Sequence, residues 1–213
     1  MELSFEWCGD TPGVLATPEG ARGAVLTIHG YGGCKEEIAG LALRISSLGF
    51  ATYSIDLQGH GENRRPLGRD VALQVAECLD FCRRYGKVAA VGHSLGGRLA
   101  LVSDADFAIG ISPALPKRFS DETRAVLSRM RRYRVVESHP GVLWEILAGL
   151  PTAEPSPARA VLYGTRDVPE IVDACRDPER GFLVTELSEA LHNDTYLLER
   201  TFAAVAARLD LWF

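Results

Sequence analysis

The chain has 213 residues, a length that suits one domain with a large core. Its hydrophobic content of 46% and charged content of 24% are ordinary for a soluble globular protein. A net charge of −5 argues against a nucleic-acid partner. No apolar run is long enough to span a membrane, and no basic-then-apolar N-terminal segment predicts a secretory signal.

Apolar runs and turn residues predict an alternation of strands and helices. The strands expected up to residue 111 are 3–7, 13–17, 24–28, 50–55, 88–91 and 107–111. The helices expected there are 35–48, a second one with its apolar stripe at Val71, Val75, Cys78 and Cys82, and 95–103. The first two strands form an edge hairpin. The alternation after them predicts a mostly parallel sheet with helices on both faces.

Residues 113–157 interrupt this alternation. Two helices are expected in this segment, at 121–134 and 142–150, and a proline-rich stretch closes it. The elements expected after it are a strand at 160–163, a helix at 170–175, a strand at 182–187, a loop at 188–193 and a last helix with its stripe at Leu198, Phe202, Val205 and Leu209. We therefore expect one domain, 1–213, with 113–157 inserted as a small helical cap over the strand ends.

The five cysteines are odd in number and show no metal-ligand spacing. Cys78 and Cys82 lie four residues apart in a helical pattern, which favours packing on one helix face. We expect all five to be free thiols in a reducing cytoplasm.

The turn Gly92-His93-Ser94-Leu95-Gly96 lies between an expected buried strand and an expected helix. A serine at the tip of such a turn is held outward on a strained backbone, where a substrate can reach its hydroxyl. The pattern alone is weak, because a shuffled chain of this composition contains it about one time in nine. Its meaning depends on a base, an acid and an oxyanion site elsewhere.

A serine nucleophile needs a base, and the base needs a third group to orient it. His192 follows the last expected strand, and Asp167 follows the strand before it. Strand ends are where such groups gather in an open α/β sheet. The alternatives for the acid are Asp173 and Asp177, and Asp167 could instead cap the next helix. The other four histidines, none of which follows the last strand, are His29, His60, His93 and His139.

A tetrahedral intermediate needs hydrogen-bond donors for its oxyanion. The backbone N–H of Leu95, at the start of the helix after Ser94, is the first candidate. The N–H of Tyr31 is the second, because Gly30 and Gly32 let that loop approach closely. The Tyr31 side chain could line an acyl pocket or only pack.

Together, five motifs resemble the α/β-hydrolase superfamily, most of all its small serine esterases and lipase-like members: 29–33 (HGYGG), 56–61 (DLQGHG), 92–97 (GHSLGG), 164–167 (GTRD) and His192. The resemblance implies an eight-stranded sheet with the second strand antiparallel, a Ser-His-Asp triad and a cap after the sixth strand. It also implies that the loop 56–61 is structural and that His60 is not the base. A glycine often precedes the catalytic histidine in the family, whereas here Leu191 does.

The expected cap is basic within an acidic chain. Seven cationic residues fall in 18 positions: Lys117, Arg118, Arg124, Arg129, Arg131, Arg132 and Arg134. They could attract an anionic substrate or form a solvated helix face, and the second reading is favoured.

These observations predict a serine hydrolase that acts on a small-molecule carboxylic ester of short to medium acyl chain, with no metal or organic cofactor. The same constellation also serves thioesterases, peptidases and acyltransferases. The fold could instead serve a non-catalytic binding module.

Overall fold

Eight strands form one sheet in a computed structural model that describes residues 1–213 apart from the side chain of Pro178. The strands are β1 (Glu2–Cys8), β2 (Thr11–Thr17), β3 (Ala24–Ile28), β4 (Ala51–Ile55), β5 (Val88–His93), β6 (Phe107–Ile111), β7 (Arg159–Arg166) and β8 (Leu183–Leu191). Their order across the sheet is β1-β2-β4-β3-β5-β6-β7-β8. The strand β5, which leads to Ser94, therefore lies between β3 and β6, inside the sheet.

The strand directions confirm the expected topology. β2 pairs antiparallel with both β1 and β4, and every pair from β3 to β8 is parallel. The β1–β2 hairpin lies at one edge of the sheet, as the sequence predicts. Because the inner strands are covered on both faces, β3, β4 and β5 are buried along their whole length.

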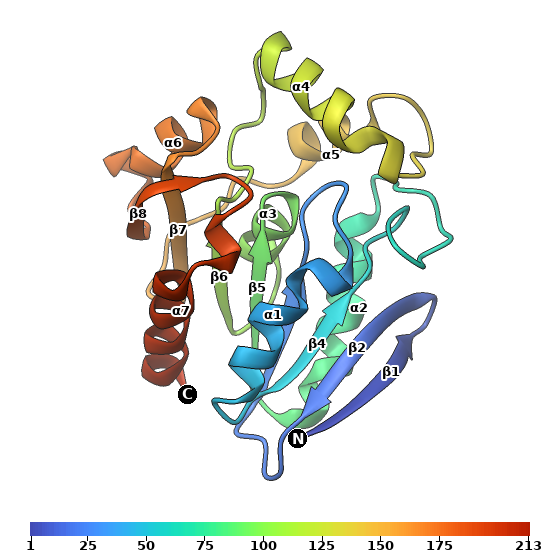
Figure 1. The fold of residues 1–213 in the computed structure, drawn as a ribbon, viewed down its shortest axis with the longest axis vertical. Helices are drawn as coiled ribbons and strands as arrows, with labels where there is room; N and C mark the ends of the chain where they lie inside the picture. Colours follow the sequence, from blue (N-terminus) through green and yellow to red (C-terminus); the bar gives the residue numbers. More distant parts are fainter.

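Helices cover both faces of the sheet. They are α1 (Lys35–Ser46), α2 (Val71–Cys82), α3 (Leu95–Val102), α4 (Asp121–Arg131), α5 (Val142–Gly149), α6 (Pro169–Arg176) and α7 (Glu199–Trp212). The apolar side chains of α1 and α7 form one buried cluster with the sheet, and those of α2, α3, α5 and α6 form the other. Figure 1 shows α1 and α7 on the same face, in front of the strands. The described residues include no helix long and apolar enough to cross a membrane.

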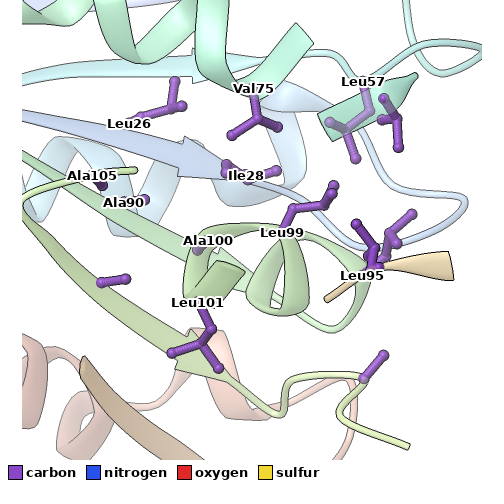
Figure 2. Packing of buried hydrophobic residues seen from close by; sticks show 14 of the residues in the cluster. Leu26, Ile28, Leu57, Val75, Ala90, Leu95, Leu99, Ala100, Leu101 and Ala105 are labelled. Carbon is purple, nitrogen blue, oxygen red and sulfur yellow. The ribbon is translucent and has the colours of Figure 1, made fainter. Parts of the chain in front are cut away.

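The larger cluster holds the turn after β5 in place. Leu95 and Leu99 of α3 pack with Ile28 at the end of β3 and with Leu57 and Val75 (Figure 2). All five side chains are at most 1% exposed. Cys78 and Cys82, on the inner face of α2, are buried in this cluster as the helical spacing predicts.

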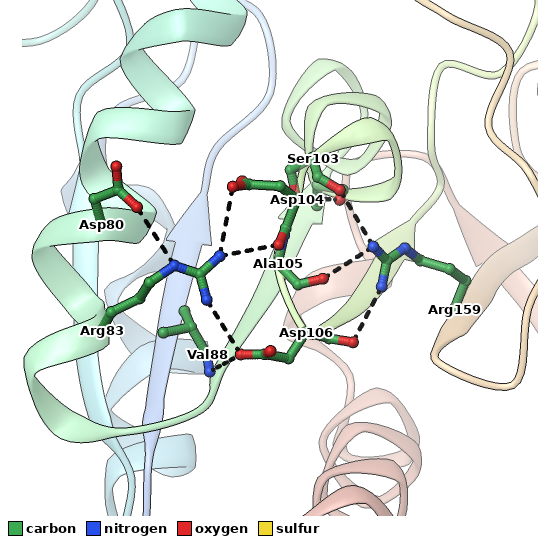
Figure 3. Close-up of polar contacts among 9 residues, drawn as sticks. Asp80, Arg83, Val88, Ser103, Asp104, Ala105, Asp106 and Arg159 are labelled. Carbon is green, nitrogen blue, oxygen red and sulfur yellow. Dashed lines mark hydrogen bonds and ion pairs between the residues drawn. The ribbon is translucent and has the colours of Figure 1, made fainter.

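A polar network joins the N-terminal ends of β5, β6 and β7, away from Ser94 (Figure 3). Arg83, just after α2, donates to the carbonyl of Asp104 at 3.0 Å, and the Asp106 carboxylate accepts from the N–H of Val88 at 2.8 Å. Arg159 donates to the carbonyls of Ser103 and Ala105 at 3.2 and 2.9 Å. These contacts fix the starts of β5, β6 and β7. The loops that include Ser94 and Asp167 follow the C-terminal ends of these strands.

Residues 113–157 run between β6 and β7 and contain α4 and α5. Figure 1 shows both helices beyond the ends of the strands, at the top of the view. α4 is shorter than predicted, because the chain tightens into a 3-10 turn at Arg132–Arg134.

The last strand was predicted too short. Residues 188–191, expected in a loop, continue β8 to Leu191, which pairs with Arg166. A register irregularity lies between Gly164 and Arg166, and Glu189 has a positive φ of 57°. This kink breaks the alternation of apolar and polar residues, so the sequence pattern ends before the strand does.

Candidate active site

Ser94 occupies a strained turn between β5 and α3. Its φ of 53° and ψ of −114° lie outside the regions that L-residues favour. Its N–H donates to the carbonyl of Ile111, and its carbonyl accepts from Arg98 and Ala114, all at 3.0 Å. The backbone of the turn is therefore fixed on both sides.

The glycines of this turn are required by close packing. A Cβ at Gly92 would collide with the backbone of Gly96, and a Cβ at Gly96 would collide with the carbonyl of Ile28. The strand and the helix can approach this closely only because both side chains are absent. The turn between β5 and α3 can therefore be as sharp as the strained serine requires.

Asp167 and His192 meet across the ends of β7 and β8. His192 Nδ1 lies 2.6 Å from Asp167 Oδ1, which also accepts from the N–H of Val168 at 2.6 Å. Burial alone would raise the pKa of Asp167, but the hydrogen bonds from His192 and Val168, the charge on His192 and the nearby Ser112 hydroxyl lower it below its usual value. The carboxylate is therefore ionised next to the imidazole.

The alternative acids lie elsewhere. Asp173 is exposed on α6, and Asp177 faces Arg180 at 3.7 Å. Asp167 does accept from Val168 at the start of α6, so its capping role coexists with its contact to His192.

Ser94 and His192 line the same two cavities, of about 590 and 40 Å³. Among the described side chains, Ser94 Oγ makes no hydrogen bond to His192. Catalytic hydrogen bonds are often long without substrate, so this does not separate the two residues functionally.

The two expected oxyanion donors belong to segments that lie next to Ser94. Leu95 begins α3, and a Cβ on Gly30, next to Tyr31, would lie 3.1 Å from Ser94 Cβ. In the part of the chain that the structure describes, neither Tyr31 nor Leu95 donates its N–H in a turn or loop hydrogen bond. Both groups are therefore free to bind an oxyanion.

A family model described as "Alpha/beta hydrolase family" matches residues 25–211. The chain belongs to the alpha/beta hydrolase family. This membership supports hydrolase activity.

Solved structures share the fold of this α/β-hydrolase over nearly its whole length. A thermophilic esterase from Thermogutta terrifontis matches with a TM-score of 0.67 and 17% identity, over 94% of each chain. A carboxylesterase structure from Nitrososphaera gargenis has a TM-score of 0.68 and 12% identity, over 99% of this chain and 98% of that one. An esterase from Pyrobaculum calidifontis has a TM-score of 0.59 and 21% identity, over 95% of this chain and 80% of that one.

One curated protein matches a part of the α/β-hydrolase sequence. Ethanol acetyltransferase 1 from Wickerhamomyces anomalus is 28% identical over 82 residues, which are 37% of this chain. The match spans only 21% of that protein's length.

The larger cavity of this α/β-hydrolase is mostly apolar. It lies between Ser94 and the segment 113–157, and its apolar lining includes Phe119, Val126, Leu127, Met130, Leu143, Trp144, Leu147 and Ile171. Val126 and Met130 are 47% and 56% exposed, because the inner face of α4 borders this open space.

Tyr31 joins the oxyanion loop to the segment above it. Its hydroxyl donates to Glu137 at 2.9 Å, and its side chain borders both cavities. Burial and the Glu137 carboxylate raise the pKa of Tyr31. The Tyr31 side chain therefore packs and also borders both cavities, so it does more than pack.

Several basic residues of the segment 113–157 have local partners. Glu37 of α1 lies 2.7 Å from Arg134 and 3.9 Å from Arg131, and Arg132 faces Glu137 at 3.2 Å. Arg124 lies 5.0 Å over the ring of Trp144. These contacts favour a structural role over capture of an anion.

Three of the other histidines are buried and neutral. Burial lowers the pKa of His29 to about 4, and that of His60 and of His93 to about 3. His29 Nε2 accepts from the N–H of Leu57 at 3.1 Å, so this histidine holds two loops together. His139 is exposed and lies 2.9 Å from Glu145.

Asp56, the first residue of the loop 56–61, forms a buried ion pair with Lys35 of α1 that the sequence did not reveal. Lys35 Nζ lies 2.8 Å from Asp56 Oδ2, and the two side chains are 1% and 0% exposed. Burial alone would lower the pKa of Lys35, but hydrogen bonds to Asp56, Glu36 and Glu62 raise it. Asp56 also accepts from the Lys35 N–H at 2.7 Å and so anchors the start of α1. A structural role for this loop, as the resemblance implies, fits these contacts.

Proposed function

We propose that this protein is a serine hydrolase that cleaves carboxylic esters through Ser94, His192 and Asp167. The observation that carries the proposal is the 2.6 Å contact between His192 Nδ1 and Asp167 Oδ1, on the same cavities as the strained Ser94. This contact leaves Nε2 of His192 as the free basic nitrogen. A base held in this tautomer can take a serine proton.

In the proposed reaction, His192 removes the proton of Ser94 as its Oγ attacks the ester carbonyl. The N–H groups of Tyr31 and Leu95 stabilise the oxyanion. His192 then gives the proton to the leaving alcohol, and an acyl-enzyme remains. Water, activated by the same histidine, releases the acid and restores Ser94. Besides the ester and water, every group that this route uses belongs to the chain itself.

The proposed substrates are esters of short to medium acyl chains. The apolar cavity of about 590 Å³ falls within the range of small-molecule pockets, roughly 300–1,000 Å³. We propose that the segment 113–157 acts as a cap that shields the acyl chain. The proposed location, a reducing cytoplasm, rests on the odd number of cysteines in the sequence.

Labelling with a fluorophosphonate tests the nucleophile. We expect the wild type to be labelled and Ser94→Ala to be unlabelled, with Ser188→Ala, an exposed serine on β8, labelled like the wild type. We also expect His192→Ala to abolish turnover of p-nitrophenyl esters. An unlabelled wild type, or equal labelling of Ser94→Ala, would contradict the proposal.

Acyl transfer to an alcohol is the second candidate, because the partial curated match is named as an ethanol acetyltransferase. An alcohol would then replace water in the attack on the acyl-enzyme. Assays with esters, thioesters and peptides, with and without ethanol, separate these activities. An ethyl ester formed faster than the free acid would favour transfer over hydrolysis.

A further inference from the structure

The two oxygens of the Asp167 carboxylate have unequal surroundings. Oδ1 accepts from His192 Nδ1 and from the N–H of Val168, each at 2.6 Å. Oδ2 is buried and has no hydrogen-bond donor assigned among the described residues. An ionised oxygen shielded from water is strongly destabilised unless a donor reaches it. A donor for Oδ2 should therefore be sought in the adjacent strand ends.

Ser112 is the polar residue best placed to be this donor. It follows β6, which lies between β5 with Ser94 and β7 with Asp167. The residue is fully buried, and its φ of 46° is unusual for a residue with a side chain. Its N–H donates to the carbonyl of Leu162 at 2.6 Å, which holds it in this conformation. Strain of this kind gathers at functional sites.

The Ser112 hydroxyl has two neighbours that could take its single proton. Its Oγ lies 3.0 Å from Thr195 Oγ1, and the nearness of the hydroxyl to the Asp167 carboxylate helps to lower the pKa of that group. The carboxylate is the stronger acceptor, because a hydrogen bond to a charged oxygen is about twice as strong as a neutral one. A hydroxyl proton turns freely toward the better partner.

Thr195 can adjust to that choice. Its Oγ1 lies 2.9 Å from the carbonyl oxygen of His192, and His93 Nε2 lies 2.9 Å from the same oxygen. If His93 Nε2 donates to the His192 carbonyl, the hydroxyl proton of Thr195 is free to bond Ser112 Oγ. That arrangement leaves the Ser112 proton available for Asp167 Oδ2.

We propose that Ser112 is a positioning residue that donates a hydrogen bond to Asp167 Oδ2, so that both carboxylate oxygens are held while His192 gains and loses its proton. This inference rests on the proposed function of the triad. The donor makes the carboxylate less basic, which limits how strongly it favours the protonated imidazole. Without the donor, His192 holds its proton more tightly and becomes free base only at higher pH.

The pH dependence of kcat/KM tests this role in Ser112→Ala and Ser112→Gly. We expect the acidic limb to move upward by about half a pH unit or more, and kcat to fall about tenfold, in both variants. Glycine accepts the positive φ, so a purely steric role of Ser112 would leave Ser112→Gly with an unshifted limb. Ser54→Ala removes a buried hydroxyl that bonds Thr27 on β3, and serves as the matched control.

The neighbouring titratable groups are unchanged in these variants. They are His93 from the end of β5, Cys175 from α6, and Arg131 from α4 with its partner Glu37 from α1. A limb that stays in place in a folded Ser112→Ala or Ser112→Gly protein, checked by circular dichroism, overturns the inference. A wild type that fluorophosphonate does not label would instead overturn the proposed function, so the two failures can be told apart.

Discussion

At the residue scale, the site depends on a few atoms held in costly arrangements. Ser94 keeps a strained φ of 53°, and Asp167 keeps an ionised carboxylate in a buried position. Each is stabilised by neighbours that the rest of the fold supplies, such as Ile111 for Ser94 and Val168 for Asp167. The reactivity of the proposed triad therefore comes from placement more than from residue type.

Replacing Asp167 by Asn should lower kcat by about 10⁴-fold, because an amide favours the wrong tautomer of the histidine. Asp173→Asn, at an exposed position on α6, is the matched control and should retain wild-type kcat. Steady-state kinetics on one p-nitrophenyl ester between pH 7 and 9 measure both. If Asp173→Asn were the damaging change, Asp167 would not be the catalytic acid.

At the element scale, α4 covers the larger cavity and is attached at both ends. Near its start, Glu170 of α6 accepts from the N–H of Ser120 at 2.8 Å and from Thr123 Oγ1 at 3.0 Å. Near its end, Arg134 pairs with Glu37 of α1. Between these attachments no α4 side chain is buried. The helix therefore spans the cavity without filling it.

The variant Val126→Trp should shorten the acyl chains that the enzyme accepts. The larger ring replaces a side chain that borders the cavity, so kcat/KM for an octanoate ester should fall about tenfold or more relative to an acetate ester. Ser128→Trp, on the exposed side of α4, is the control and should keep the wild-type preference. An unchanged octanoate-to-acetate ratio in Val126→Trp would show that the acyl chain lies elsewhere.

The sequence predicted the features that depend on residues close together in the chain. Apolar runs marked nearly every strand, and the order of Ser94, Asp167 and His192 followed from their places after strands. It did not reveal Lys35 with Asp56 or Tyr31 with Glu137, because these pairs are far apart in the chain and each residue alone looks ordinary. Ser112 directly follows a buried strand, as Asp167 does, so the same rule could have selected it.

At the scale of the whole molecule, three buried histidines make the fold sensitive to acid. The pKa values of His29, His60 and His93 are lowered from 6.5 to about 4, 3 and 3. Below pH 6.5 the unfolded chain binds protons that the folded chain refuses, so stability falls as the pH falls toward these folded values. The lowered pKa of Asp167 adds its own loss only below its usual value of 3.8.

The free energy of unfolding should therefore fall steeply between pH 6.5 and 4.5. Three histidines give a limiting slope of roughly 4 kcal/mol per pH unit, reached near the lower end of this window. Urea titrations at several pH values measure it, and His139→Gln, which changes an exposed histidine, should leave the slope as it is. Constant stability across the window would mean that these histidines are protonated in the folded protein.

The backbone contacts of Gly92 and Gly96 affect what the motif around Ser94 indicates when related sequences are compared. Gly92 and Gly96 are demanded by contacts between the backbones of β5, α3 and β3, whether or not any substrate is ever bound. A descendant of this protein that lost its chemistry would still need both glycines to fold. It could exchange Ser94 for another small residue without touching those contacts. Among sequences with this fold, the two glycines therefore indicate common ancestry, and only the serine between them distinguishes members that could carry out the proposed reaction.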